Sequence, residues 1–385
     1  MAFKGRVCSR GVWDESIPGI SFDENGNSNY SKIFDNILKD FELGESGNKK
    51  WEHIVEEIKK AGKGKPYDCI IGVSGGTDSS YLLHLAKKYK LRPLAVYLDN
   101  GWSTNIAVSN IKKVLTPLQI DLVTHVIDYE EVKDVLKAYL RAQLPWADSP
   151  TDIAIRAILY KIANRYGLKH ILIGHDFRSE GFQPTEWTYS DDKQLRVLSK
   201  KFSNRSLKTF PNLTLSSFIY YSFVKRIKYV KPFFYLEYSK QLAKAFLEKT
   251  YGWEDYGGHH YENIFTKFII SYWLYEKFGI DKRKISYSAQ ILSGEMTRGQ
   301  AMMEIEKNPY NREQIDGDIA YICKKLDISI EEFHMLMQGK NKLFSDYPSY
   351  YPLYQSFKKI IFFVLRFLLP NKPLMAYQME SRGKK

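Results

Sequence analysis

Short apolar runs alternate with amphipathic stretches along the first half of the chain. Apolar runs of strand length occupy residues 68–73, 94–98, 121–127 and 170–173. The stretches between them have helical spacing, and strands that alternate with helices are typical of a doubly wound α/β fold with a mainly parallel sheet. From about residue 235 onward the spacing predicts a mostly helical region. The expected helices are residues 51–62, 80–88, 105–115, 129–143, 152–166, 239–249, 261–278, 297–305 and 328–337.

Composition is that of a globular protein in a reducing compartment. The chain has 385 residues, of which 44% are hydrophobic and 26% charged, so disorder of the whole chain is excluded. Three cysteines, Cys8, Cys69 and Cys323, are too few and too far apart for a disulfide framework. Neither a secretory signal nor an apolar run of spanning length is recognisable, and we therefore expect a cytoplasmic protein.

The net charge of +13 is concentrated in two places. Residues 193–231 carry ten Lys and Arg and no acid, residues 355–385 carry a net +6, and the remainder is −3. A nucleic-acid binder spreads basic residues along the face that follows the phosphates, so we expect no nucleic-acid partner. We expect the first patch, with Lys225, Arg226 and Lys228, to border the site and attract an anionic substrate.

A glycine-rich turn joins the first apolar run to the next helix. Two glycines let the backbone approach a ligand closely, and a helix N-terminus favours an anion. Serine hydroxyls add donors, and the aspartate is of the type that holds the Mg²⁺ accompanying a triphosphate. A Walker pattern is absent, so this is a different phosphate loop. The loop residues are Ser74, Gly75, Gly76, Thr77, Asp78 and Ser79.

The loop resembles the pyrophosphate loop of the N-type ATP pyrophosphatases (the PP-loop superfamily), which cleave ATP to AMP and pyrophosphate. Within that superfamily, residues 7–302 resemble the N-acetyl-sugar amidotransferases of surface-polysaccharide and flagellin-glycan synthesis. The matching segments are residues 22–26, 98–102, 150–152, 174–181, 256–262, 279–284 and 293–298.

This resemblance implies a reaction that converts a sugar acetamido group to an acetamidino group with ATP and ammonia. An amide is a poor electrophile, so its oxygen is adenylylated to an imidate, and ammonia then displaces AMP. The departing pyrophosphate needs cationic partners, for which Lys282, Arg283 and Arg298 are candidates. The expected acceptor is an anionic N-acetyl sugar or a sugar nucleotide.

The resemblance also implies positions for the binding residues. Asp99 and Gly174 follow strands close to the nucleotide, and Thr151 and Asp152 face the acceptor. At residue 176 the family commonly has Asn, where this chain has Asp. The residues expected to complete the sugar pocket are Glu180, Trp187, His260, Tyr261 and Glu262.

Two features of the family are missing. Its members typically begin with two C-x-x-C pairs that resemble a zinc knuckle, but the corresponding positions here are Cys8, Gly11, Ser28 and Ser31. One thiolate cannot hold a structural zinc, so we expect no zinc. The chain also has Ala2 where an N-terminal-cysteine glutaminase needs its nucleophile. We therefore expect ammonia from a separate glutaminase subunit, as the resemblance also implies.

Four segments and two rival functions complete these expectations. The first segment, residues 1–48, resembles a zinc knuckle that has lost its cysteines, and the ATP pyrophosphatase domain follows at 49–195. A basic insert with a helical substrate or partner region covers 196–345, and a basic hydrophobic tail covers 346–385. Residues 357–369 are apolar and basic but too short to span, which suits peripheral membrane contact, a partner subunit or packing on the last domain. The rivals are a tRNA-modifying enzyme with the same loop and a non-catalytic nucleotide-binding scaffold.

Overall fold

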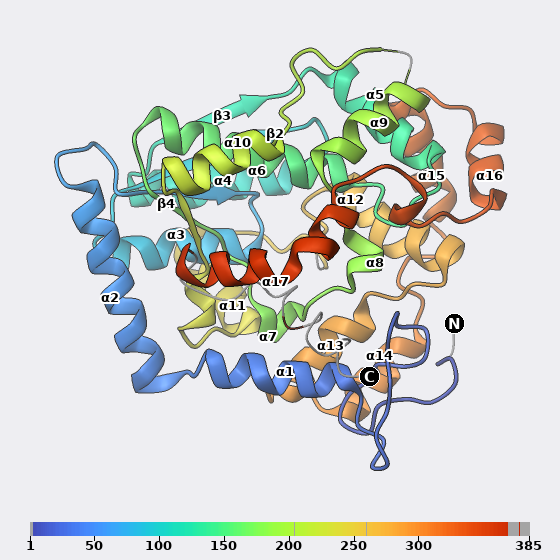
Figure 1. Ribbon diagram of the computed structural model, residues 1–385, viewed down its shortest axis with the longest axis horizontal. Coiled ribbons are helices and arrows are strands. Elements are labelled where there is room, and N and C mark those ends of the chain that lie inside the picture. The colour runs from blue at the N-terminus through green and yellow to red at the C-terminus, as the bar shows by residue number, and fades with distance from the viewer. Residues whose placement is uncertain (1–2, 204, 259, 369–376, 378–385) are drawn as a thin grey trace.

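A five-stranded parallel sheet forms the centre of the protein. The computed structural model describes residues 3–203, 205–258, 260–368 and 377. The strand order is β3-β2-β1-β4-β5, and every neighbouring pair is parallel (Figure 1). The expected α/β fold is therefore confirmed. The strands are β1 (Cys69–Val73), β2 (Pro93–Asp99), β3 (Leu122–Val126), β4 (His170–Leu172) and β5 (Lys228–Val230).

Helices surround this sheet and make up most of the second half of the chain. Those of the first half are α1 (Asn29–Asp40), α2 (Gly44–Gly62), α3 (Thr77–Lys88), α4 (Asn105–Leu118), α5 (Tyr129–Arg141), α6 (Ser149–Arg165), α7 (Phe177–Glu180), α8 (Thr185–Thr188) and α9 (Asp192–Phe202). They are followed by α10 (Leu215–Ile219), α11 (Lys240–Tyr251), α12 (Ile264–Phe268), α13 (Arg283–Leu292), α14 (Arg298–Glu306), α15 (Ile315–Leu326), α16 (Ile330–Gln338) and α17 (Tyr351–Leu368). The helix expected at 261–278 is α12, continued by a π-helical stretch at Ile269–Lys277.

The central strands are buried on both faces, which explains why they appear in the sequence as continuous apolar runs. Ile70 and Val96 belong to a core cluster with Leu159 of α6. Cys69 and Ile71, which alternate with Ile70 along β1, pack in the main core with residues of α3 and α4. The alternation therefore places α6 on one face of the sheet and α3 with α4 on the other.

The edge strand β5 was not expected from the sequence. It comes from the basic segment, and its residues Lys228 and Val230 pair with His170 and Leu172 of β4. The strand has only three residues and is half-buried at two of them, so it lacks the apolar run that identifies the central strands. The sheet thus extends past residue 195 into the segment expected to be an insert.

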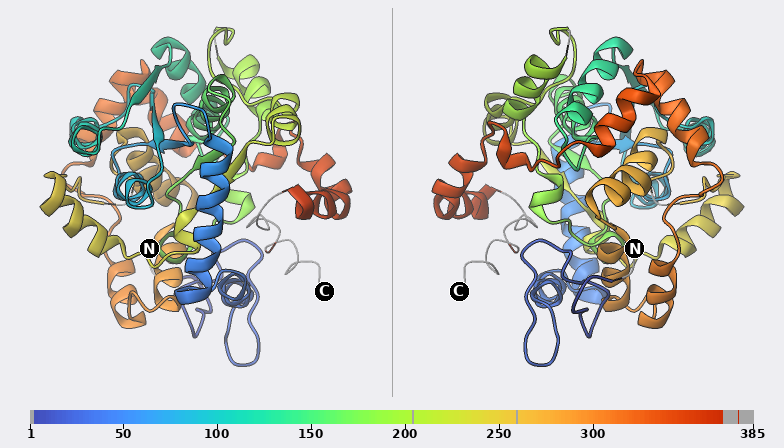
Figure 2. Two further views of the ribbon diagram at one scale, coloured as in Figure 1. Left: turned by 90° about the vertical axis from the view of Figure 1, so that its left-hand side faces the viewer. Right: turned by 90° about the vertical axis from the view of Figure 1, so that its right-hand side faces the viewer.

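Helix α17 stands at the periphery of the molecule (Figure 2). Three apolar side chains at helical spacing are strongly exposed on it: Leu353 at 50%, Phe357 at 48% and Ile360 at 61%. Residue 369, the last of the tail segment 357–369, lies outside the described residues. No helix in the described part of the chain is both long enough and apolar enough to cross a membrane. Contact of this segment with a membrane or a partner stays a prediction.

Candidate active site

The phosphate loop lies where the carboxyl end of β1 meets the N-terminus of α3. Gly76 is the N-cap of α3, and Gly75 has a φ of 80°, which an L side chain rarely adopts. A Cβ on Gly75 would also lie 2.0 Å from the carbonyl oxygen of Ala107, so the residue must be glycine. The Trp253 indole N–H donates to the Gly75 carbonyl at 3.1 Å. The loop is thus held tightly between α4 and the segment that follows α11.

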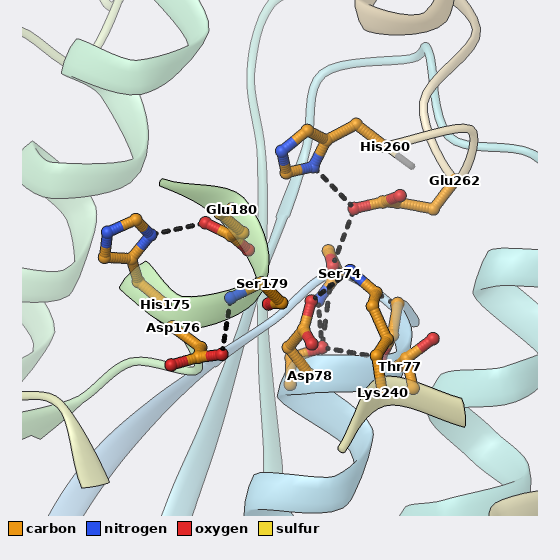
Figure 3. Close-up of polar contacts among 12 residues, drawn as sticks. Ser74, Thr77, Asp78, His175, Asp176, Ser179, Glu180, Lys240, His260 and Glu262 are labelled. Atoms are coloured by element: carbon orange, nitrogen blue, oxygen red, sulfur yellow. Dashed lines mark hydrogen bonds and ion pairs between the residues drawn. The ribbon is translucent and has the colours of Figure 1, made fainter. Parts of the chain in front are cut away.

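Residues 256–258 and 260–262 lie over this loop, and Figure 3 shows Glu262 beside Ser74. The Tyr256 hydroxyl accepts from the Thr77 backbone N–H at 3.2 Å, and the Ser74 hydroxyl donates to Glu262 Oε1 at 3.4 Å. A Cβ on Gly76 would lie 3.1 Å from that Tyr256 oxygen and 3.2 Å from that Glu262 oxygen. Both oxygen atoms therefore occupy the space above the loop in which an anion would meet its donors.

Asp78 is engaged by two side chains from beyond β5. The Tyr238 hydroxyl donates to its Oδ1, and the Lys240 ammonium lies 2.9 Å from its Oδ2 (Figure 3). Since both oxygens have partners and one partner is a cation, this carboxylate does not fit the expected role of magnesium ligand. Gly174 was expected near the nucleotide, and a Cβ on it would lie 2.8 Å from the carbonyl carbon of Asp78. Its role in the structure is to let the chain after β4 approach α3.

A cavity of about 320 Å³ opens at the carboxyl ends of β1 and β2, and we call it the strand-end cavity. Apolar side chains of the strands and α6 form part of its wall, and Ser74 connects it to the phosphate loop. The polar side chains that line it include Asn100, Asp148, Thr151, Asp152, His260 and Lys282. Four expected site residues from distant parts of the sequence, Thr151, Asp152, His260 and Glu262, therefore meet in one cavity.

The structure places Asn100, and not its neighbour Asp99, at the strand-end cavity. Asn100 donates through Nδ2 to the Thr151 hydroxyl at 3.2 Å. Asp99 accepts from the Gly101 N–H at 2.8 Å and lines a separate groove between α4 and β3. The family resemblance placed Asp99 near the nucleotide, but successive side chains alternate between the two faces of the sheet.

Two further cavities border this one. The aromatic cavity, of about 760 Å³, is lined by Tyr160, Phe182, Tyr189, Phe218 and Tyr229 together with Arg156, His175 and Lys231. The polar cavity, of about 530 Å³, is lined by Lys240, Lys244, Asp281, Arg283 and Glu295 among others. Glu180 lines both of them, and Lys282 lines all three cavities. The Lys282 ammonium is thus the group at which the three spaces meet.

Burial brings the pKa values of two groups in the strand-end cavity close to neutral pH. Burial raises the pKa of Asp148 to about 7, and the negative charge of Asp152 adds to this effect. Burial lowers the pKa of Lys282 to about 8, although Asp152, Glu180 and Asp148 oppose the change. Trp146 joins the cluster: its indole N–H donates to Asp152 at 2.7 Å, and its ring lies 4.1 Å from the Lys282 nitrogen.

Two histidine–glutamate pairs flank the phosphate loop (Figure 3). His175 Nδ1 lies 2.5 Å from Glu180, and His260 Nδ1 lies 3.7 Å from Glu262. Burial would lower the pKa of His260 and raise that of Glu262. Their hydrogen bond and opposite charges outweigh burial, so the pKa of His260 is raised and that of Glu262 is lowered. Both shifts favour the ion-paired form of the second pair beside the loop.

Position 176, where this chain departs from the family, serves a structural purpose. Asp176 is the N-cap of α7, and its carboxylate accepts from the backbone N–H groups of Arg178 at 3.2 Å and Ser179 at 3.0 Å. An Asn side chain has only one oxygen to accept these bonds, so Asp is suited to this cap.

Two residues expected at the site lie elsewhere, and a third is held by contacts within the protein. Trp187 is 5% exposed, belongs to the main core and lines none of the three cavities. Arg298 donates to the carbonyl of Gly11 at 3.0 Å and so fastens α14 to the N-terminal segment. Arg283 forms an ion pair with Asp281 at 2.7 Å and donates to three carbonyls at the end of α14. The structure therefore does not place Trp187 or Arg298 at the three cavities, and Arg283 is bound within the protein although it borders the polar cavity.

We expect Arg283→Met to act on stability. The substitution leaves Asp281 buried without its partner and removes the donors to α14, which should lower the free energy of unfolding by about 3 kcal/mol. Chemical denaturation of the variant measures this loss. If Arg283→Met instead unfolded like the unchanged protein but lost ATP cleavage, Arg283 would have to act in the reaction as first expected.

Hydrogen bonds connect three of the four positions in the N-terminal segment that correspond to the cysteines of the family. The Ser28 N–H donates to the Cys8 sulfur at 3.3 Å, and the Ser31 hydroxyl donates to the Ser28 carbonyl at 2.7 Å. Nearby, Asp14 and Lys284 form a buried ion pair at 2.6 Å that ties the segment to α13. No cluster of three or more His, Cys, Asp or Glu that could hold a metal occurs among the described residues.

The basic segment does not border the site at the expected residues. Lys228 begins β5, and the Lys225 carbonyl accepts from Lys169, which lies just before β4. Because the strands are parallel, these groups and Arg226 lie at the end of the sheet opposite the phosphate loop. The expectation that Lys225, Arg226 and Lys228 border the site is therefore not met. From the same segment, Lys231 lies at the carboxyl end of β5 and lines the aromatic cavity.

Comparison with known proteins identifies the C-terminal part of the chain. Residues 262–361 match the family model described as LPS biosynthesis protein WbpG-like, C-terminal domain. An uncharacterized protein of Methanocaldococcus jannaschii is 36% identical over 137 residues, which are 34% of this chain. The chain spans about half the length of that relative, 46%.

Three solved structures are more distant. The NH3-dependent NAD synthetase of Campylobacter jejuni is 15% identical, with 45% of this chain and 72% of that chain covered and a TM-score of 0.27. The NMN synthetase of Francisella tularensis is 16% identical over 67% and 91%, with a TM-score of 0.31. The U34-tRNA thiolase of Methanococcus maripaludis is 14% identical over 72% and 87%, with a TM-score of 0.30. Likenesses at this level carry no functional information. Residues 262–361 are thus similar to the C-terminal domain of the WbpG-like LPS biosynthesis proteins.

Proposed function

We propose that this protein is an ATP-dependent amidotransferase that converts the acetamido group of a sugar to an acetamidino group. The observation that supports this proposal is the position of Lys282. It stands where the cavity beside the phosphate loop meets a second cavity whose aromatic and polar walls suit a sugar. A reaction between a nucleotide and a sugar needs such a junction.

The chemistry consists of two substitutions. The acetamido oxygen attacks the α-phosphorus of ATP, and the bond to pyrophosphate breaks with both of its electrons going to the departing group. Ammonia then adds to the imidate carbon, and the bond from that carbon to the AMP oxygen breaks. The sugar keeps an amidine, which carries a positive charge at neutral pH, and AMP takes the former acetamido oxygen.

The residues of this chain have separate tasks in that sequence. The N-terminus of α3 and the Lys282 ammonium stabilise the charge that develops on pyrophosphate. For a phosphate to reach the Thr77 N–H, the Tyr256 hydroxyl has to release it. In the aromatic cavity, the rings cover the sugar, and Arg156 and Lys231 attract its negative group. Since Asp78 does not fit a magnesium ion as it stands, no step is assigned to Mg²⁺, which we expect to arrive bound to ATP.

Ammonia is expected from a separate glutaminase subunit. That expectation follows from the family resemblance and from the absence of a glutaminase nucleophile in the sequence. Free ammonium ion should replace the partner in vitro.

Incubation with ATP, Mg²⁺, ammonium and a panel of anionic N-acetyl sugars and sugar nucleotides tests the proposal. We expect pyrophosphate release together with a product about one mass unit lighter than the acceptor, because NH replaces oxygen. Release with tRNA alone would favour a tRNA-modifying enzyme. ATP binding without pyrophosphate release from any acceptor would favour a scaffold, and either result would overturn the proposal.

A further inference from the structure

Asp148 is a buried acid that has no role in the reaction steps proposed above. It lies just before α6, is 3% exposed and lines the strand-end cavity. The Thr266 hydroxyl donates to its Oδ2 at 2.5 Å. Its Oδ1 is fully buried, and within the described part of the chain no hydrogen-bond partner reaches it. Leaving a buried carboxylate oxygen unpartnered is costly, so such an arrangement suggests a ligand or a proton.

Charged groups face Asp148 from three directions. Asp152 lies one turn further along α6, His260 comes from the segment over the phosphate loop, and Lys282 precedes α13. The like charge of Asp152 and the burial favour the protonated acid, whereas His260, Thr151 and Thr266 favour the carboxylate. Burial and the charge of Asp152 outweigh the groups that favour the carboxylate, so the pKa of Asp148 is raised to about 7 and the group can exchange a proton at neutral pH.

The other carboxylates around Lys282 are less suited to that exchange. Asp152 accepts from Trp146, and Glu180 lies against His175. Glu262 pairs with His260, which lowers its pKa and keeps it ionised. A base that is ionised but strongly stabilised takes up a proton poorly.

We propose that Asp148 is the general base of the amidination step, an inference that rests on the proposed function. When ammonia adds to the imidate carbon, its nitrogen becomes a positively charged NH3 group on a tetrahedral carbon. The carboxylate of Asp148 takes one proton from this nitrogen. The nitrogen's freed electron pair then forms the C=N bond as the C–O bond to AMP breaks with its electrons. The result is a protonated amidine, AMP and a neutral Asp148, which returns its proton to water.

The test measures the rate of amidine formation against pH at a constant concentration of free NH3, so that protonation of ammonia does not itself change the rate with pH. A base must be ionised to act, so the rate of the unchanged enzyme should fall as the pH drops through about 7. Asp148→Asn retains an oxygen for the Thr266 bond but accepts no proton. We expect it to form amidine at least about 100-fold more slowly and to lose this dependence on pH. Its adenylylation, followed as pyrophosphate release without ammonium, should stay near that of the unchanged enzyme.

A second variant separates proton transfer from structure. Thr266→Val keeps the shape of the side chain but removes the donor that stabilises the Asp148 carboxylate. The pKa of Asp148 should rise, and the acidic fall in rate should move to higher pH by about one unit. Thermal unfolding of both variants at the same pH checks that they remain folded.

The outcomes distinguish the two proposals. If the unchanged enzyme forms no amidine from any acceptor, the proposed function fails. If it forms amidine but Asp148→Asn keeps its rate and its pH profile, the assignment of Asp148 alone is overturned. An acidic limb that Thr266→Val leaves in place or moves to lower pH would also contradict the assignment.

Discussion

Replacing Lys282 with methionine is expected to lower the rate of pyrophosphate release by about 100-fold to 1,000-fold. Methionine fills similar space beside Trp146 but carries no charge, so the developing negative charge loses its buried cation. The effect should appear in kcat at saturating ATP and acceptor, because the interaction strengthens as pyrophosphate departs. The pKa of Lys282 is about 8, so the rate of the unchanged enzyme should also decline as the pH rises through that value.

Lys244→Met is the matched control for Lys282→Met. Lys244 lines the polar cavity as well, but it is paired with Asp255 at 2.7 Å and does not reach the other two cavities. We expect this variant to release pyrophosphate at nearly the normal rate. Equal losses in the two lysine variants would mean that Lys282 contributes only to the general positive charge of the region.

Gly75→Ala should destabilise the protein and abolish nucleotide binding. Alanine is strained at a φ of 80°, and its methyl group would lie 2.0 Å from the Ala107 carbonyl oxygen. Strain and overpacking together should cost about 3 kcal/mol or more of the free energy of unfolding. Denaturant unfolding measures the stability, and titration with ATP measures the binding of the fraction that folds.

The control for Gly75→Ala is Gly64→Ala. Gly64 has nearly the same conformation, a φ of 77°, but a Cβ there would meet nothing within 4 Å. The strain of the backbone alone should cost about 1 kcal/mol and leave ATP binding unchanged. If the two alanine variants were equally stable and bound ATP equally well, the close packing of the loop against α4 would be disproved.

The sequence was sufficient for features that depend on local pattern. The apolar runs of β1, β2 and β4 are continuous because those strands are mostly buried on both faces. The glycines at 75 and 76 mark the turn into α3. The residues at 151, 152, 260 and 262 were found only through the motifs that carry the family resemblance. Their meeting in one cavity depends on the sheet, because the carboxyl ends of parallel strands lie at one edge.

Long-range packing accounts for what the sequence did not predict. Strand β5 is too short and too polar to show an apolar run, and its partner β4 stabilises it. Asp99 and Asn100 are neighbours that point toward different faces of the sheet, and the sequence alone does not reveal which of them faces the cavity. A basic side chain such as Arg283 looks the same in a sequence whether it meets a substrate or three backbone carbonyls.

The fate of the acetamido oxygen tests the central claim most directly. An acceptor sugar whose acetamido oxygen is a heavy isotope should be incubated with ATP, Mg²⁺ and ammonium, and the nucleotide products analysed by mass spectrometry. If the oxygen attacks ATP as proposed, the label leaves the sugar and appears in AMP, while the pyrophosphate is unlabelled. AMP without label, or a sugar that keeps it, would contradict the account.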